Sequence, residues 1–179
     1  MNRIFNKLFN LSGFFMEIKW ILNSRKIAKI KLLVFDIDGV LTNGQLLINE
    51  NGDITREFNV RDGLGIKLLQ QNNIIVAFIS GGEGKSTIKR AEMLGISNCL
   101  INIKNKQIAL RELQNKLNIL PSNTAFVGDD INDLVIKDDV SLLIGTKDSA
   151  PQFSVNADLL LKSCGGNGTA RELSDRILN

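Results

Sequence analysis

The fold of this chain is decided by the stretch Lys31-Leu32-Leu33-Val34-Phe35-Asp36-Ile37-Asp38-Gly39-Val40-Leu41-Thr42. Its apolar run is too short for a helix and rich in β-forming residues, which predicts a strand buried on both faces. Two carboxylates, two residues apart, follow this run directly. A buried ionised carboxylate is costly unless it is paired or bound to a metal. Because ligands bind at the carboxyl ends of strands in open α/β sheets, Asp36 and Asp38 are the first candidates for chemistry.

The composition indicates one globular domain and excludes several kinds of site. The 179 residues include 22 Lys and Arg and 19 Asp and Glu, a net charge of +3 that is too mild to indicate nucleic-acid binding. The sequence contains no histidine, so any metal must be held by oxygen ligands. The two cysteines, Cys99 and Cys164, form no CxxC pair, which predicts free thiols and a cytoplasmic location.

Residues 1–25 differ in character from the rest of the chain. Their apolar residues are interrupted by charges, so no stretch approaches the ~20 apolar residues of a membrane span. The cleavage pattern of a signal peptide is also missing. We expect residues 1–25 to be an N-terminal extension, helical or disordered, ahead of a domain over residues 26–179. An amphipathic helix packing on the domain or on another subunit is favoured over attachment to a membrane surface.

After the first strand, strand and helix patterns alternate, which predicts a parallel sheet of the α/β class. Residues 45–58 form a hairpin around an Asn-Gly pair, and Asp62 is expected to cap a helix that ends near Gln71. The other expected strands are Ile74–Ile79, Cys99–Ile101, Thr124–Val127, Val140–Ile144 and Leu159–Leu161. Three other helices are expected. One follows Ser80-Gly81-Gly82 and ends at about Leu94, and the other two cover Lys106–Leu117 and Thr169–Leu178.

Polar residues follow three of these strands: Asp36 and Asp38, Ser80-Gly81-Gly82, and Asp129-Asp130 with Asp133. Strand ends in such a sheet meet at one edge, so we expect these groups to lie close together. Several carboxylates at one point repel each other unless a cation lies among them, and oxygen ligands favour Mg²⁺. Lys106, at the start of its helix, could neutralise a phosphate and Asp36. The sequence therefore predicts Mg²⁺-dependent phosphoryl transfer through Asp36.

These residues resemble a known family. Asp36–Thr42, Ser80, Lys106 and Gly128–Asp133 are similar, in order, to the four motifs of the haloacid dehalogenase superfamily of phosphatases. The hairpin, the loop Asn59–Gly63 and the Gly-Gly-x-Gly segment before Arg171 resemble the 3-deoxy-D-manno-octulosonate 8-phosphate phosphatases. The resemblance covers about residues 27–178. It implies a Rossmann-like sheet with a small hairpin flap and no large cap domain. It also implies a cytoplasmic homotetramer that acts on a sugar-acid phosphate of lipopolysaccharide biosynthesis.

The resemblance assigns a role to each matching residue. It implies that Asp36 is the nucleophile and Asp38 the general acid and base, and that Ser80 and Lys106 hold the phosphoryl oxygens. It implies Mg²⁺ ligands from the Asp36 carboxylate, the Asp38 carbonyl and Asp129, with Asp130 and Asp133 orienting the metal site and Lys106. The substrate contacts that it implies are Asp38, Asn59, Val60, Arg61, Asp62, Gly63, Lys67, Arg90, Lys106 and Arg171. A neighbouring subunit would place its Gly165–Gly168 segment and Arg171 over each active site.

The chain departs from the family pattern at three cationic positions. Ser80-Gly81-Gly82 replaces the usual Thr-Gly-Arg, which keeps the hydroxyl but loses the arginine, and Lys85 is the candidate replacement. Lys67 and Asn167 each stand where an arginine is usual. A lysine cannot make the bidentate carboxylate contact of an arginine. These departures leave a nine-carbon, sialic-acid-type 9-phosphate open as the substrate.

Two functions of other classes also remain open. A receiver domain combines acidic residues, Mg²⁺, Ser or Thr and Lys on an α/β sheet, but its acidic pair normally precedes the phosphorylated strand. The other alternative is a non-catalytic partner of a sugar-nucleotide pathway enzyme. The intact motifs argue against it.

Overall fold

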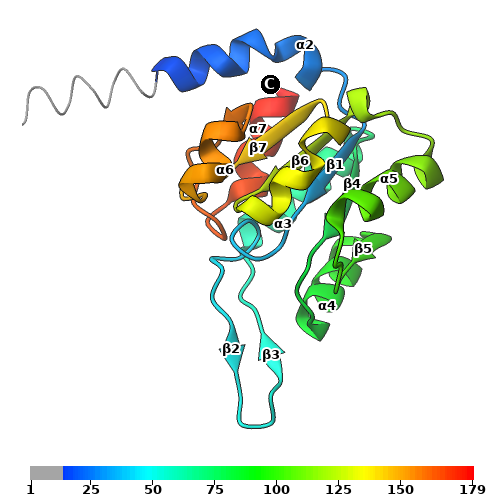
Figure 1. Cartoon of the computed structure of the whole chain (residues 1–179), viewed down its shortest axis with the longest axis vertical. Helices are drawn as coiled ribbons and strands as arrows, with labels where there is room; N and C mark the ends of the chain where they lie inside the picture. The colour runs from blue at the N-terminus through cyan, green and yellow to red at the C-terminus, as the bar shows by residue number, and fades with distance from the viewer. Residues whose placement is uncertain (1–13) are drawn as a thin grey trace, which may run out of the picture.

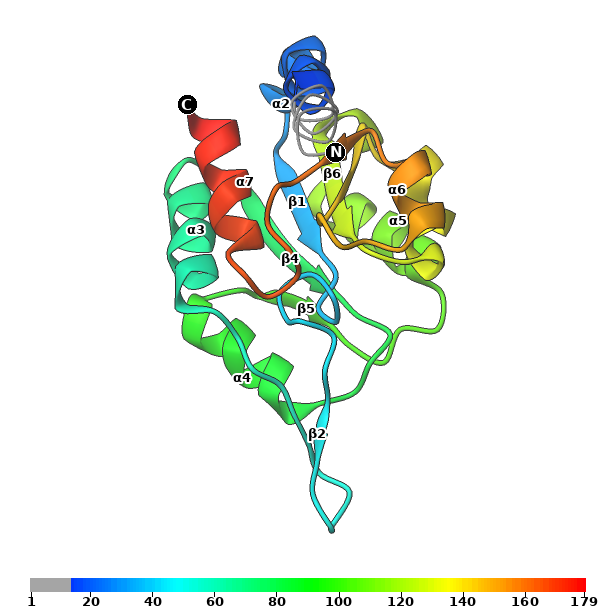
Figure 2. The ribbon, with the colours of Figure 1, turned by 90° about the vertical axis from the view of Figure 1, so that its left-hand side faces the viewer.

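The computed structural model, which describes residues 14–179, contains a parallel six-stranded sheet with helices on both faces (Figures 1 and 2). The bounds of the strands are β1 Leu32–Phe35, β2 Leu47–Ile48, β3 Ile54–Thr55, β4 Ile75–Ile79, β5 Asn98–Leu100, β6 Thr124–Gly128, β7 Leu142–Gly145 and β8 Leu159–Leu160. The bounds of the helices are α2 Ser24–Ile27, α3 Val60–Gln71, α4 Lys85–Leu94, α5 Lys106–Leu117, α6 Pro151–Asn156 and α7 Thr169–Leu178, with 3₁₀ segments η1 Pro121–Asn123 and η2 Ile131–Asp139. The expected α/β class is confirmed.

The order of the strands, β5-β4-β1-β6-β7-β8, makes β1 the strand from which the chain builds the sheet in both directions. The chain first adds β4 and β5 on one side of β1, and then crosses back to add β6, β7 and β8 on the other. Leu32 pairs in register with Ile75 of β4 and with Thr124 of β6. The topological switch point therefore lies between β1 and β6, where sheets of this kind bind their ligands.

Side chains of the central strands alternate between two apolar cores, one on each face of the sheet. In β1, Leu33 and Phe35 pack in the core beneath α3, α4 and α7, whereas Leu32 and Val34 pack in the core beneath α5, η2 and α6. Figure 2 shows α3 and α7 on one side of the sheet and α5 and α6 on the other. Both faces are covered, which explains why β1 consists entirely of apolar residues.

The hairpin of β2 and β3 extends away from the body of the molecule (Figure 1). Its turn is held by Asn49, whose side-chain oxygen accepts hydrogen bonds from the backbone N–H groups of Asn51 and Asp53. Gly52 has φ +81°, the left-handed conformation that the expected Asn-Gly turn requires. Leu47 and Ile48 are 66% and 64% exposed, so this arm presents apolar side chains to its surroundings.

Residues 14–22 are helical and pack against the sheet domain. The Trp20 ring is buried, and its Nε1 donates a hydrogen bond to the carbonyl of Leu160 at 3.1 Å. The Arg176 guanidinium lies 4.5 Å from the ring centroid and also pairs with Glu17. The first 13 residues lie outside the described part, so the division at residue 25 stays a prediction. Among residues 14–179, none of the helices has the length and apolar character that spanning a bilayer would demand.

One capping prediction was wrong, and two segments were not predicted. Asn59, not Asp62, caps α3, because its side chain accepts the backbone N–H of Arg61 at 2.8 Å. The segments η2 and α6 follow β6 and β7 and complete the second face of the sheet. Both are short or irregular, so their apolar periodicity is too weak to be read from sequence alone.

Candidate active site

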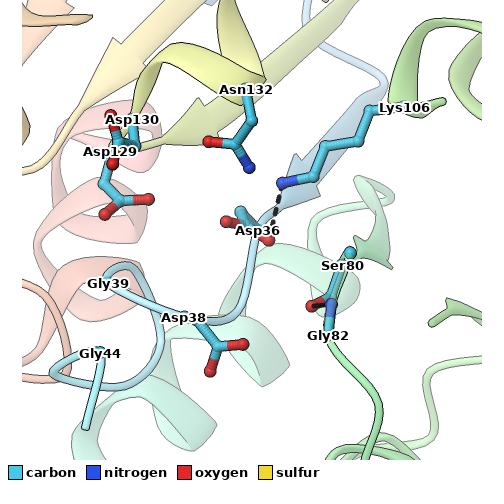
Figure 3. Close-up of a pocket in the computed structure, with 11 residues that line it drawn as sticks. Asp36, Asp38, Gly39, Gly44, Ser80, Gly82, Lys106, Asp129, Asp130 and Asn132 are labelled. Atoms are coloured by element: carbon cyan, nitrogen blue, oxygen red, sulfur yellow. Dashed lines mark hydrogen bonds and ion pairs between the residues drawn. The ribbon is translucent and has the colours of Figure 1, made fainter. Parts of the chain in front are cut away.

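Three neighbouring strands bring their carboxyl ends to one pocket of about 360 Å³. Asp36 follows β1, Ser80 follows β4 and Asp129 follows β6. Since β1 pairs with both of the other strands, these residues meet as their positions at strand ends predict. The pocket, drawn in Figure 3, is lined by Asp36, Asp38, Gly39, Gly44, Ser80, Gly81, Gly82, Lys106, Asp129, Asp130 and Asn132.

Lys106 supplies a buried cation to this pocket. Helix α5 begins at Lys106 because Asn105 caps it, accepting the backbone N–H of Ile108 at 3.0 Å. The Lys106 Nζ lies 3.0 Å from Oδ1 of Asp36 and 2.5 Å from Oδ1 of Asp133, and Figure 3 shows the ammonium pointing toward Asp36. Burial lowers the pKa of Lys106, but the two carboxylates together raise it by more, so the amine remains a cation.

Asp36, Asp129 and Asp133 form a cluster in which one carboxylate oxygen of each lies within 4.8 Å of the others. Burial is the main cause that raises the pKa of all three carboxyl groups, and repulsion from neighbouring carboxylates adds to it for Asp36 and Asp129. The pKa of Asp129 rises to about 7. One lysine cannot neutralise three carboxylates. An oxygen-only donor set of this density fits a hard divalent cation such as Mg²⁺.

Besides Asp129, the segment after β6 contains Asp130 and Asp133, which lie in different surroundings. Asp133 is fully buried, and its Oδ2 accepts the backbone N–H of Asp129 at 3.2 Å while its Oδ1 contacts Lys106. Asp130 is exposed and caps η2 by accepting the backbone N–H of Ile131 at 2.7 Å. Asp133 is therefore built to orient Lys106 and Asp129. Asp130 adds negative charge at the rim of the pocket.

Glycine at position 39 allows the Asp129 carboxylate to approach the turn that follows β1. Gly39 has φ +82°, and a β-carbon at this position would collide with the Asp129 carboxylate. A side chain here would be strained twice, by the left-handed backbone and by the contact. The glycine of the Asp-Ile-Asp-Gly motif therefore leaves the space that the Asp129 carboxylate occupies.

Two residues at or beside the pocket received no role from the sequence. Arg56, which follows β3, pairs with Asp38: its Nε and Nη2 donate to the two carboxylate oxygens at 2.7 and 3.0 Å. Asn132 points its amide toward Asp36 (Figure 3). Asn132 lies inside a recognised motif and could have been found from it. Arg56 lies on the hairpin arm, where no local pattern distinguishes it from a solvated charge.

The structure keeps most of the expected substrate-contacting residues away from the pocket. The residues that do not line it are Asn59, Val60, Arg61, Asp62, Gly63, Lys67, Arg90 and Arg171. Val60, Arg61 and Lys67 are exposed on α3. The Arg90 guanidinium donates to the carbonyl of Asn59 at 2.8 Å, and its Nη2 would lie 2.8 Å from a β-carbon at Gly63.

Asp62 caps α7, a helix far from it along the chain. Its Oδ1 accepts the backbone N–H groups of Ala170 at 2.7 Å and Arg171 at 3.2 Å, in the first turn of α7. These groups have no partner within their own helix, and the carboxylate also opposes the positive end of the helix dipole. The Arg171 side chain pairs with Asp175 of the same helix at 3.0 Å. Asp62 therefore fastens α3 to α7.

The glycine segment before α7 packs against the chain's own active-site turn. β-carbons at Gly165 and Gly166 would overlap the backbone of Gly39 and Thr42. The Gly166 N–H donates to the carbonyl of Val40 at 2.9 Å, which holds the segment in place. Within this chain the segment supports the turn after β1, and its expected role over a neighbouring active site stays a prediction.

Known proteins resemble this chain over most of its length, although no family model matches the sequence. The chain is 39% identical over 153 residues to 3-deoxy-D-manno-octulosonate 8-phosphate phosphatase from Escherichia coli (strain K12), a match covering 86% of this chain and 81% of that protein.

Solved structures lead to the same group. A phosphatase of the same name from Moraxella catarrhalis, in complex with magnesium ion, phosphate ion and a KDO molecule, has a TM-score of 0.83 and 37% identity, covering 87% of this chain and 89% of that one. A Legionella pneumophila structure described as a HAD superfamily (subfamily III A) hydrolase has a TM-score of 0.87 and 36% identity, covering 93% of this chain and 91% of that one. The resemblance drawn from the motifs is confirmed.

Proposed function

This chain belongs to the 3-deoxy-D-manno-octulosonate 8-phosphate phosphatases of the haloacid dehalogenase superfamily, and on that premise we propose that it hydrolyses this sugar-acid phosphate with Mg²⁺. The observation that carries the proposal is the position of Asp36. Its buried carboxylate lines the pocket at the end of β1, 3.0 Å from the Lys106 ammonium and beside Asp129. A carboxylate so placed can act as a nucleophile toward phosphorus.

In the first step, a carboxylate oxygen of Asp36 attacks the phosphorus atom and the bond from phosphorus to the sugar oxygen breaks. An alkoxide is a poor leaving group, so the sugar oxygen takes a proton from the Asp38 carboxyl as it departs. The products of this step are the free sugar acid and an aspartyl phosphate on Asp36. Asp38 lines the same pocket and is partly exposed, so it can reach a leaving group on the open side.

In the second step, water attacks the phosphorus atom of the aspartyl phosphate. Asp38, now a carboxylate, accepts a proton from the water as the new bond forms. The bond between phosphorus and the Asp36 oxygen breaks, which releases inorganic phosphate and restores both carboxyl groups. One pair of carboxyl groups thus serves both steps, and no histidine is required.

The donor set of the pocket fits Mg²⁺, because three carboxylates crowd together with a single lysine among them. Asp36, the Asp38 carbonyl and Asp129 would hold the ion. When bound, Mg²⁺ neutralises charge on the phosphoryl oxygens and orients them for in-line attack. Asp133 and Asp130 would orient these ligands from behind and from the rim.

Lys106 and Ser80 are proposed to hold the phosphoryl oxygens. Lys106 would stabilise the negative charge that develops on them in the transition state. The Ser80 Oγ accepts the backbone N–H of Gly82 at 3.1 Å, which fixes the hydroxyl at the pocket wall with its own O–H free to donate. The serine thus keeps the donor that a threonine would supply.

The sugar acid is proposed to extend from the pocket toward α3, where Arg61, Lys67 and Arg90 offer positive charge beside Asn59 and Val60. Arg171 would act from a neighbouring copy in a homotetramer. The exposed apolar side chains of the hairpin support such association, because a monomer gains nothing from presenting them to water. A cytoplasmic location agrees with Cys99 and Cys164 being free.

The test is phosphate release with Mg²⁺ from a panel containing the eight-carbon 8-phosphate, nine-carbon sugar-acid 9-phosphates, and pentose and hexose phosphates. We expect a clear preference for the eight-carbon acid. Asp36→Asn and Asp38→Asn should abolish turnover while the fold survives, which thermal unfolding of each variant checks. Exposed Asp138 provides the control, Asp138→Asn.

The other outcomes have definite meanings. A preference for a nine-carbon acid would contradict the proposed substrate but keep the chemistry. A phosphoenzyme that persists without turnover would favour a signalling domain of the receiver type. The absence of phosphate release from every ester in the panel would leave the fold standing and favour a non-catalytic partner.

A further inference from the structure

Arg56 is a charged residue with a buried side chain. Its side chain is 2% exposed, although it lies at the root of an arm whose other residues are mostly in solvent. Burial of an arginine is unfavourable unless its donors are paired. Here all three donor nitrogens are used: Nε and Nη2 bond the Asp38 carboxylate, and Nη1 donates to the carbonyl of Glu83 at 2.6 Å.

The guanidinium fills space that two glycines leave open. A β-carbon at Gly82 would lie 2.7 Å from Nη2 of Arg56 and 2.8 Å from Oδ2 of Asp38. A β-carbon at Gly84 would collide with Nη1. No side chain at either position is compatible with Arg56 in this place. Gly82 is also the position at which the resembling family carries its arginine, and a side chain there would begin next to the Arg56 guanidinium.

The contacts of Arg56 join three separate parts of the site. Arg56 belongs to the arm, Asp38 to the turn after β1, and Glu83 to the loop after β4. A bidentate pair fixes both the position and the plane of a carboxylate, which a single contact does not. Asp38 is partly exposed. Within residues 14–179, all hydrogen bonds and ion pairs of its carboxylate oxygens are made with Arg56. Arg56 is therefore what orients Asp38.

We propose that Arg56 is the positioning residue for Asp38, holding one carboxylate oxygen in place while the other carries the proton that Asp38 gives to the leaving group, and that it replaces from the hairpin the arginine that position 82 lacks. The inference rests on the proposed phosphatase mechanism and extends it to a residue that the motifs do not contain. Lys85, the alternative replacement, is exposed at the start of α4. Arg56 acts on the reaction through Asp38. It does not line the pocket itself.

The test compares leaving groups, because a general acid matters only when the leaving oxygen needs a proton. Arg56→Met removes the charge and keeps most of the volume, while Arg56→Lys keeps the charge and loses the bidentate geometry. Both are assayed as kcat/KM on the sugar-acid phosphate, on glycerol phosphate and on p-nitrophenyl phosphate. The first two substrates release an alkoxide, whereas nitrophenolate leaves without a proton. Arg111→Met is the matched control, since the exposed Arg111 side chain also pairs with a carboxylate, that of Asp139 at 2.8 Å, and lies away from the pocket.

We expect Arg56→Met to lower kcat/KM by about 10- to 100-fold on both alkyl phosphates, a part of the usual contribution of general acid catalysis. On p-nitrophenyl phosphate the loss should stay within about threefold. Arg56→Lys should recover part of the lost activity, and Arg111→Met should match the wild type on all substrates. Thermal unfolding of each variant shows whether it is folded.

A second set of variants tests the shared space. Gly82→Arg alone should be inactive, because the new side chain collides with Arg56. Arg56→Ala combined with Gly82→Arg should be more active on alkyl phosphates than either single variant. A combination no better than the single variants would contradict the replacement.

Three results would overturn the positioning role. Equal losses on all three substrates would make Arg56 a structural residue. A rise in KM for the sugar acid alone would make it a substrate contact. No loss would leave it without a role. The comparison of glycerol phosphate with p-nitrophenyl phosphate does not need the natural substrate, so a failure of the proposed substrate is seen separately in the wild-type panel.

Discussion

Removing the buried Lys106 cation should destabilise the protein strongly, and Mg²⁺ should reverse much of the loss. The change is Lys106→Met, which keeps an unbranched side chain of similar length. Lys106, Asp36 and Asp133 have side chains that are 5%, 6% and 0% exposed, so the variant leaves two carboxylates buried without their cation. The question is how large the loss is.

Two estimates bracket the effect. Unit charges 3.0 Å apart interact by about 5 to 6 kcal/mol at an effective dielectric constant of ~20. The desolvation of the ammonium cancels a part of this attraction. Measured losses on removing one partner of a buried pair are about 3–5 kcal/mol, because the remaining charge is uncompensated. For a domain of this size each kcal/mol corresponds to ~2–4 °C, so the melting temperature should fall by about 6–20 °C.

The assay is thermal unfolding of metal-free protein near neutral pH, followed by a titration with Mg²⁺. A divalent cation among Asp36, Asp129 and Asp133 supplies the charge that Lys106 no longer provides, so the melting temperature should recover with Mg²⁺. Lys104→Met, at an exposed position in the loop just before α5, is the control. If the melting temperatures of Lys106→Met and Lys104→Met are equal in the absence of Mg²⁺, the buried pair does not stabilise the fold as described.

The same geometry leads to three further predictions. In metal-free protein the pKa of Asp129 is raised from 3.8 to about 7, and that of Asp36 is also raised, so the folded state binds more protons than the unfolded state in this window. Stability should therefore fall as the pH rises from about 4 to about 7, and Mg²⁺ should raise the melting temperature more above this window than within it. Gly39→Ala should lower both stability and Mg²⁺ affinity, measured by urea unfolding and calorimetry, because the methyl group displaces the Asp129 carboxylate. Asp62→Ala should cost about 1–2 kcal/mol in urea unfolding, the usual value of a lost helix cap.

Each of these has a matched control. Gly52→Ala has the same left-handed backbone, with φ +81° and open space around the new methyl group, so it reports the strain alone. Equal effects at Gly39 and Gly52 would show that the Asp129 contact is unimportant. Asp138→Ala, at an exposed position, is the control for Asp62→Ala. A metal-free stability that is flat between about pH 4 and about pH 7 would contradict the raised carboxyl pKa values.

The sequence alone predicted the elements whose causes are local. Helix α5 covers Lys106–Leu117, the range that its apolar spacing predicts, and α4 ends at Leu94 before the left-handed Gly95. β1 could be recognised because a strand buried on both faces must be apolar throughout. Strands pointing the same way bring their ends to one edge, so the meeting of Asp36, Ser80 and Asp129 could be deduced without coordinates.

Contacts between segments far apart could not be deduced in this way. Asp62 was expected to cap its own helix and instead caps α7, 108 residues away. A capping motif shows that a carboxylate can accept N–H groups, but which helix end lies near it depends on how α3 and α7 pack. Arg56 reads as an ordinary surface charge in sequence, since nothing within the hairpin requires it to be buried.

The sequence by itself determined the fold class, the family and the central carboxylates, because hydrophobic periodicity and closely spaced motifs are properties of short segments. Only the tertiary structure decided which partners these groups have. It placed Arg56 against Asp38 and Asp62 at the N-terminus of α7. The physical reason is that charge pairing and burial depend on distance in space, and long-range packing sets that distance independently of separation along the chain.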